Sequence, residues 1–154
     1  MLMKAVLPLI PLFTLLTSCQ QDIQSTTAEV CSANQYLLSL PQDIDTYRHD
    51  MAIYTQQGGE LPLHSVVFDN TCIDATSLKD LTQRSAQAIL ADNFKEAGQV
   101  THFKIKNNVA YVELQANNDG WPGVNATLAA VNPIIRRNLL LNSQIENVIF
   151  HSMD

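Results

Sequence analysis

The stretch Val100–Ala116, VTHFKIKNNVAYVELQA, decides the fold of this chain. Two runs of strand-forming residues flank Asn107-Asn108, and asparagine tolerates the positive φ that a two-residue hairpin turn requires. The sequence therefore predicts a β-hairpin with a fixed register. The predicted partners are Lys106 with Val109, Ile105 with Ala110, Phe103 with Val112, and Thr101 with Leu114.

This register sorts both strands into two faces at once. The predicted inner face carries Thr101, Phe103, Ile105, Ala110, Val112 and Leu114. The predicted outer face carries His102, Lys104, Lys106, Val109, Tyr111 and Glu113. A sheet with one apolar face needs helices to cover that face, so we expect helices on either side of the hairpin in the sequence.

The segment before the hairpin contains further apolar runs. Met51–Thr55 and Leu61–Phe68 resemble two strands, and Gly58-Gly59 between them can supply positive φ for a connecting loop. Tyr36–Leu40 fits either an edge strand or one helical turn, because periodicity does not separate the two in so short a run.

Two helices are predicted. Ser77 and Asp80 have the spacing of a capping box, and helical periodicity follows at Leu78, Leu81, Ser85, Ala88 and Ile89. A second helical pattern runs through Val124, Leu128, Val131, Ile135 and Leu139. Pro133 either kinks that helix or begins a new helix capped by Asn132.

Ile145–His151 reads as a last strand, which gives the order ββ, α, ββ, α, β. We therefore expect an α+β domain with one mainly antiparallel sheet and two helices packed on one face. With 154 residues, of which 46% are hydrophobic, the chain can form one domain with a core. Its formal net charge is −6 and its basic residues form no patch, so we expect no nucleic-acid partner.

The N-terminus has the features of a signal peptide at residues 1–18. Lys4 precedes an apolar run, Ala5–Leu16, that is too short to span a bilayer comfortably. The run ends in Leu16-Thr17-Ser18-Cys19, which resembles the bacterial lipoprotein box. The resemblance implies cleavage before Cys19, a diacylglycerol on the Cys19 sulfur and an acylated amino terminus. The alternative is an ordinary signal peptide with an incidental cysteine.

Gln20 rather than an aspartate follows the cysteine, which in a cell with two membranes resembles the default signal for the outer membrane, facing the periplasm. Residues 19–29 are polar and aperiodic and are expected to form a flexible tether, and residues 30–154 a single domain. In an exported protein, Cys31 and Cys72 suggest a disulfide; two free thiols are the alternative.

Several motifs resemble the GerMN-type domain, named for a spore-germination protein and found in bacterial envelope lipoproteins. They are an early strand ending in Tyr at Met51–Tyr54, then Leu61-Pro62-Leu63, Ala88–Leu90, the segment Phe103–Leu114, and the closing Asn147-Val148-Ile149-Phe150. The resemblance covers Met51–Phe150 and departs from the family at Asn107-Asn108, at Val112-Glu113-Leu114 and after the last strand. It implies an envelope binding or assembly module and carries over no catalytic residue.

The chemistry-bearing residues form no recognised catalytic or metal motif. His102 and Glu113 are predicted neighbours on the outer face, which fits either an acid/base pair or an ordinary polar pair. Asp69 and Asp74 flank Cys72 without the spacing of a calcium loop. No histidine pair has metal-binding spacing, and we expect neither a metal nor another cofactor.

The remaining candidate is a turn-rich loop with the chain's single tryptophan. Trp121 could present its ring to a ligand, with Asn117, Asn118 and Asp119 supplying polar contacts, or it could cover the sheet edge. The sequence thus predicts a non-enzymatic, lipid-anchored envelope protein that binds a protein partner or peptidoglycan. The alternative is a small cell-envelope hydrolase using His102, Glu113 or the Asp69/Asp74 region.

Overall fold

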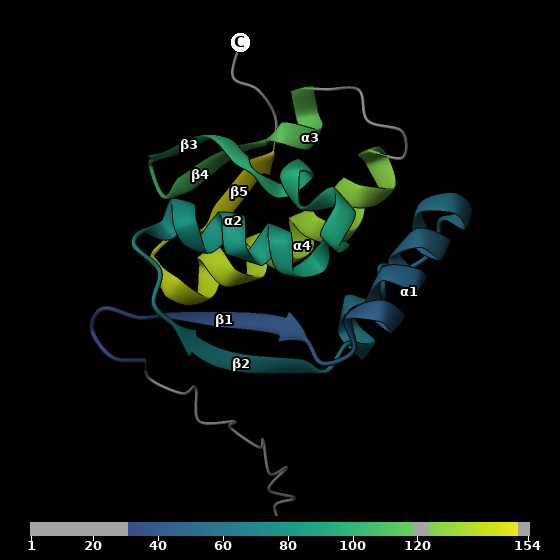
Figure 1. Cartoon of the computed structure of the whole chain (residues 1–154), viewed down its shortest axis with the longest axis horizontal. Helices are drawn as coiled ribbons and strands as arrows, with labels where there is room; N and C mark the ends of the chain where they lie inside the picture. The colour runs from purple at the N-terminus through teal and green to yellow at the C-terminus, as the bar shows by residue number, and fades with distance from the viewer. Residues whose placement is uncertain (1–30, 119–123, 151–154) are drawn as a thin grey trace, which may run out of the picture.

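The structure is a computed structural model and describes residues 31–118 and 124–150. It has three layers, with helices between two small sheets (Figure 1). The first sheet contains β3 (Val100–Lys106), β4 (Val109–Leu114) and β5 (Asn147–Phe150). The middle layer contains α2 (Leu78–Ile89) and α4 (Val124–Asn142), and the second sheet contains β1 (Tyr36–Pro41) and β2 (Phe68–Ile73).

The third long helix, α1 (Ile44–Gln57), packs beside α4 at one end of the layers (Figure 1). Short helical segments complete the described chain: η1 (Pro62–Ser65), η2 (Asp92–Gly98) and α3 (Gln115–Asn118). The α+β class is confirmed. The prediction of a single sheet with two helices on one face is wrong, because β1 and β2 form a separate sheet on the opposite side of α2 and α4.

The hairpin forms at the predicted turn. Asn107 and Asn108 both have positive φ, 51° and 59°, as a primed two-residue turn requires. From Lys106 to His102 the strands pair as predicted, but a bulge follows and Val100, not Thr101, lies opposite Leu114. The bulge turns apolar Val100 into the core, where it is 4% exposed, and leaves Thr101 in solvent.

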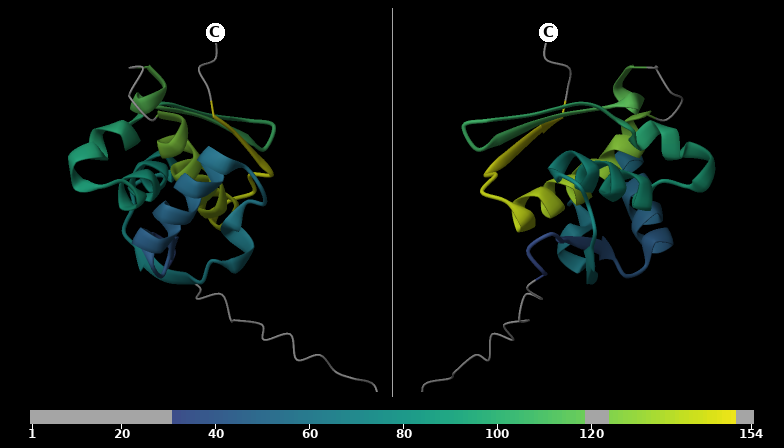
Figure 2. Two further views of the ribbon diagram at one scale, coloured as in Figure 1. Left: turned by 90° about the vertical axis from the view of Figure 1, so that its right-hand side faces the viewer. Right: turned by 60° about the vertical axis from the view of Figure 1, so that its left-hand side comes forward.

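The inner face is only partly covered. Ala110, Val112 and Leu114 are buried, whereas Phe103 is half-buried and Ile105 is exposed. Figure 2 shows the turn end of the hairpin reaching past α2. Ile105 belongs to β3 two residues before the turn and is 46% exposed. β5 adds to β4 in parallel, which makes this sheet mixed.

The two strands predicted at Met51–Thr55 and Leu61–Phe68 are wrong. Met51–Thr55 belongs to α1, whose N-cap Asp43 accepts a hydrogen bond from the Thr46 backbone N–H. Helical spacing buries Tyr47 and Met51 together, four residues apart. Gly58 has the predicted positive φ but ends a helix instead of joining two strands.

The second of those segments begins with η1, and its strand β2 starts only at Phe68. β2 pairs with β1 in antiparallel orientation, which settles Tyr36–Leu40 as a strand. The Ser77 cap is confirmed: its hydroxyl oxygen accepts from the Asp80 backbone N–H at 3.2 Å. α4 continues through Pro133 as one helix, so Asn132 is not an N-cap.

The hydrophobic core lies between the β3–β4–β5 sheet and the helices. Its fully buried members include Tyr47 and Met51 of α1, Ala86 and Ile89 of α2, Ala110, Val112 and Leu114 of β4, Val131, Ile134, Ile135 and Leu139 of α4, and Val148 of β5. One continuous core thus joins segments from both halves of the described chain.

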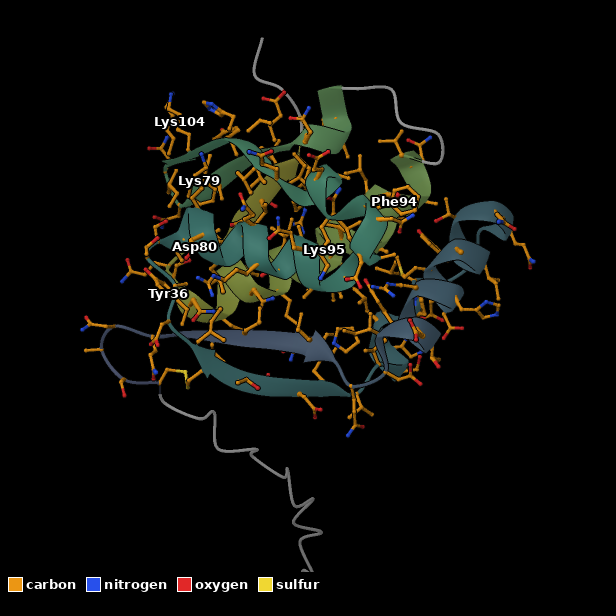
Figure 3. All side chains as sticks on the ribbon, viewed as in Figure 1. Tyr36, Lys79, Asp80, Phe94, Lys95 and Lys104 are labelled. Atoms are coloured by element: carbon orange, nitrogen blue, oxygen red, sulfur yellow. A yellow bond between two sulfur atoms is a disulfide. The ribbon has the colours of Figure 1, made fainter. Side chains whose placement is uncertain are left out.

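Cys31 and Cys72 form the predicted disulfide, with their Cα atoms 5.5 Å apart; its sulfur–sulfur bond is drawn in yellow in Figure 3. The bridge joins the start of the described chain to β2 across 41 residues of sequence. In the part of the chain that the structure describes, no helix is long and apolar enough to cross a membrane.

Candidate binding groove

α4 is held against β1 by two asparagine side chains. The Ser39 backbone N–H donates to Asn138 Oδ1 (2.7 Å), and Asn138 Nδ2 donates back to the Ser39 carbonyl (3.2 Å). One helical turn later, Asn142 makes the same pair of bonds with the backbone of Leu37 (2.6 and 2.7 Å). These amides take the place of a neighbouring strand, so β1 is hydrogen-bonded along both edges.

The same helix carries a second stripe that does not face the core. Positions i, i+3, i+4, i+7 and i+8 lie on one helix face, and here they hold Pro133, Arg136, Arg137, Leu140 and Leu141. Leu140 and Leu141 are 42% and 48% exposed. The rest of the described chain therefore leaves Leu140 and Leu141 partly uncovered.

The stripe forms one wall of a groove of about 320 Å³, which we call the α4 groove. It is lined by Leu63, Phe68, Pro133, Arg136, Arg137, Leu140 and Leu141. Leu63 comes from η1 and Phe68 from the start of β2, at the end of that strand remote from the disulfide. The walls are apolar apart from the two arginines.

Arg137 is held in position within the groove. Its Nε donates to the Ser39 hydroxyl at 2.8 Å, and its guanidinium carbon lies 3.9 Å from the centroid of the Phe68 ring. Burial lowers the pKa of Arg137 from its ordinary value, although the group stays protonated at any physiological pH. Its two terminal amino groups have no hydrogen-bond partner among the described residues.

Arg136 lies beside it on the rim. Its terminal nitrogens donate to Asn147 Oδ1 (2.7 Å) and to the Val148 carbonyl (2.8 Å), and the group lies 5.9 Å from the Phe150 ring centroid. These bonds tie α4 to β5. They satisfy part of the guanidinium, and no carboxylate of the described residues neutralises its positive charge.

Arg136 and Arg137 differ from the other two arginines of the chain in their pairing with carboxylates. Arg48 is paired with Asp45 at 2.9 Å, and Arg84 with Asp80 at 3.0 Å. No carboxylate lies within 4.0 Å of Arg136 or Arg137 among the described residues. In a chain with a net charge of −6, the groove thus concentrates positive charge that no described carboxylate pairs with.

Two other hollows of the described surface are lined by no lysine or arginine. A hollow beside α1 contains Asp43, which already accepts from Thr46. A larger polar hollow near the disulfide contains Gln35, Thr76 and Asn142, all of which are bonded within the chain. The α4 groove is therefore the best candidate site.

The sequence-predicted site residues do not converge on this groove. Asn117 Oδ1 accepts from the Leu114 backbone N–H at 2.9 Å, which is a structural role, and Asn118 ends α3. Cys19, Asp119 and Trp121 lie outside the described residues.

His102 and Glu113 are cross-strand neighbours as predicted, but no hydrogen bond or ion pair joins their side chains within residues 31–118. Asp74 accepts from Gln35 Nε2 at 3.1 Å, and Asp69 lies opposite Leu40 on β2. Over the two described ranges, no three His, Cys, Asp or Glu side chains are grouped so as to hold a metal ion.

Comparison with protein-family models gave no match, and comparisons with curated proteins and with solved structures gave no significant match. The charged residues alone do not reveal the groove, because Arg136-Arg137 is an isolated basic pair in the sequence. The spacing from Pro133 to Leu141 was the signal that could have found it.

Proposed function

We propose that this chain is a lipid-anchored protein of the bacterial envelope that binds a partner through the α4 groove. The lipoprotein-box residues Leu16–Cys19 support the anchor, and a disulfide fits an oxidising compartment outside the cytoplasm. The observation that carries the binding role is the half-buried Arg137, whose charge has no carboxylate partner and whose terminal amino groups point to no acceptor in the described chain.

The walls of the groove favour a protein partner over peptidoglycan. Leu63, Phe68, Leu140 and Leu141 present apolar surface, which gains most from burying apolar side chains. A polar glycan strand would gain little from such walls. The similarity to the GerMN-type domain agrees with a binding module. It rests on Ala88–Leu90 and on Phe103–Phe150, since Met51–Tyr54 and Leu61–Leu63 are not strands.

The anchor is tested by intact mass measurement and fractionation. We expect the processed protein to begin at Cys19, to carry acyl chains and to sediment with the outer membrane. Cys19→Ser should remove the acyl mass and release the protein from the membrane fraction. An unmodified amino terminus in the wild-type protein would overturn the proposed location.

The binding role is tested by site-specific photocrosslinking in cells. A photoreactive side chain at Leu141 should give one discrete crosslinked protein, because this position is on the groove wall. The same probe at Ile53 is the matched control, since Ile53 is exposed to a similar extent but lies on α1. Equal crosslinking patterns at both positions, or crosslinks to isolated sacculi alone, would count against a protein partner at the groove.

A further inference from the structure

The α4 groove combines two chemical features that together define a class of ligand. Leu140 and Leu141 offer exposed apolar surface, and Arg137 offers two free terminal amino groups within the same groove. Because Nε of Arg137 is engaged by Ser39, the terminal pair is held in a fixed direction. A planar pair of N–H donors matches the two oxygens of a carboxylate.

The positive charge of Arg137 is also not neutralised by any described residue. The partly desolvated cation at Arg137 has a ring beneath it and a neighbouring cation, but no anion among the described residues. Arg136 adds attraction for a negative group at the rim. An incoming carboxylate would supply the missing charge, and the neighbouring leucines would be covered by apolar groups on either side of it.

We propose that the α4 groove binds an extended protein segment in which a carboxylate side chain is flanked by apolar side chains. The carboxylate pairs with Arg137, and the apolar side chains cover Leu140 and Leu141. This inference rests on the proposed binding function and specifies the chemistry of the partner.

A membrane surface fits these observations less well. Recognition of anionic lipid takes clusters of several lysines and arginines, and the groove has two. Lys104, another exposed cation, lies on β3 at the far side of the helix layer, as Figure 3 shows. The net charge of −6 disfavours approach to an extended anionic surface. Salt screens this repulsion over about 8 Å, so it does not prevent one carboxylate from contacting the groove arginines directly.

The test uses the mature lipidated chain in nanodiscs of zwitterionic lipid and three fluorescein-labelled peptides. The first has one glutamate between two leucines in a glycine-serine background. The second replaces the glutamate by glutamine, and the third replaces both leucines by serine. Fluorescence anisotropy gives the affinity of each peptide for the wild-type protein and its variants.

We expect the glutamate peptide to bind the wild-type protein at least fivefold more tightly than either counterpart. Arg137→Gln should abolish the difference between the glutamate and glutamine peptides. Arg84→Gln, which removes an exposed arginine of α2, should preserve it. Leu140→Ser should weaken the binding of the glutamate and the glutamine peptides, whereas Ile53→Ser should weaken the binding of neither.

A second variant guards against loss of folding in Arg137→Gln, since that arginine also holds Ser39. Leu140→Glu places a carboxylate three residues from Arg137 on an exposed site of the same helix face. It should remove the preference for the glutamate peptide with little change in melting temperature.

Equal binding of the glutamate and glutamine peptides to the wild-type protein would overturn the carboxylate assignment. So would a preference that survives in both Arg137→Gln and Leu140→Glu. Groove-dependent binding to anionic vesicles, or self-association that Leu140→Ser abolishes, would assign the surface to a membrane or to a second copy. A discrete crosslink at Leu141 together with no glutamate preference would leave the binding function standing and reject only this chemistry.

Discussion

At the scale of single residues, Asn138 is a buried polar residue that joins α4 to β1. Its side chain is fully buried and bonds the Ser39 N–H, the Ser39 carbonyl and the Ser85 hydroxyl. Asparagine suits the position because its amide carries both a donor and an acceptor, as a peptide group does. No apolar residue of similar size could satisfy the backbone edge of β1.

We therefore predict that Asn138→Ala lowers the free energy of unfolding by about 2–4 kcal/mol, because it leaves buried polar groups without partners. Urea titration followed by circular dichroism measures the change. Asn125→Ala, at an exposed position of the same helix, is the control and should change stability by less than about 0.5 kcal/mol. Similar values for both variants would show that the amide bridge to β1 contributes little.

Tyr47 is the second residue with a measurable signature. It is 2% exposed and its hydroxyl donates to the Ala130 carbonyl at 2.6 Å, which joins α1 to α4. Burial raises the pKa of Tyr47 well above its ordinary value. As the pH rises, the phenol of Tyr47 loses its proton in the unfolded chain before it does so in the folded protein. Its contribution to the free energy of unfolding is therefore complete below about pH 10 and declines as the pH rises further.

We predict that the stability of the wild-type protein falls more steeply above about pH 10 than that of Tyr47→Phe. The measurement is the unfolding free energy of both proteins between pH 7 and pH 11. Lysines titrate in the same range in both proteins, so the difference between the two curves reports Tyr47 alone. At pH 7 the variant should lose about 1 kcal/mol, the contribution of one hydrogen bond. A difference that stays constant with pH would contradict the buried, neutral state of the phenol.

At the scale of elements, the β3–β4 hairpin depends on its turn. Asn107 and Asn108 both adopt the left-handed conformation, and the Asn108 carbonyl also accepts from the Glu146 backbone N–H at 2.8 Å. The turn thereby sets the register of β3 and helps to place the start of β5. Asn107 and Asn108 share the same backbone conformation, but the contact with Glu146 is made by Asn108.

We predict that Asn107→Ala lowers the unfolding free energy by about 1 kcal/mol, because alanine pays a steric cost at positive φ. Asn107→Gly should be neutral or stabilising, since glycine has no such cost. Thermal unfolding of the two variants, side by side, measures both. The prediction fails if alanine and glycine at this position give the same melting temperature.

α1 shows why elements could be misassigned from the sequence. Met51–Thr55 has strand-forming residues, but the cap at Asp43 and the buried pair Tyr47 and Met51 favour a helix. These signals lie outside the five residues that suggested a strand. A longer window, from the cap to the glycine at Gly58, contains the helical pattern.

At the scale of the whole molecule, the disulfide fastens the β1–β2 layer. Cys72 lies on β2, and the bridge closes a loop of about 40 residues that contains β1 and α1. In the chain-entropy account, a loop of this length contributes roughly 4 kcal/mol by restricting the unfolded chain.

We predict that the double variant Cys31→Ser/Cys72→Ser unfolds with a free energy lower by about 2–4 kcal/mol under non-reducing conditions. Under reducing conditions, its melting temperature should match that of the wild-type protein. The comparison of the two proteins in both conditions separates loss of the bridge from damage by the serines. Equal stability without reductant would show that the bridge is absent or makes no contribution.

The sequence alone determined those features that depend on neighbours in the chain. The Asn107-Asn108 turn fixed the pairing down to His102, and the Ser77 cap fixed the start of α2. Turn chemistry and capping act over a few residues, so a short window contains all the information they need. The sequence suggests the pairing of Cys31 with Cys72 but leaves two free thiols as the alternative, and the bridge itself is a finding of the structure.

Only the tertiary structure decided how the elements combine. Whether β1 and β2 join the hairpin sheet or form their own depends on Asn138 reaching Ser39, 99 residues away in sequence. The α4 groove likewise needs Phe68 beside Arg137, which no local pattern predicts. Contacts of this kind depend on how helices and strands pack, because a side chain's partner is set by the folded arrangement and not by its own neighbours in the chain.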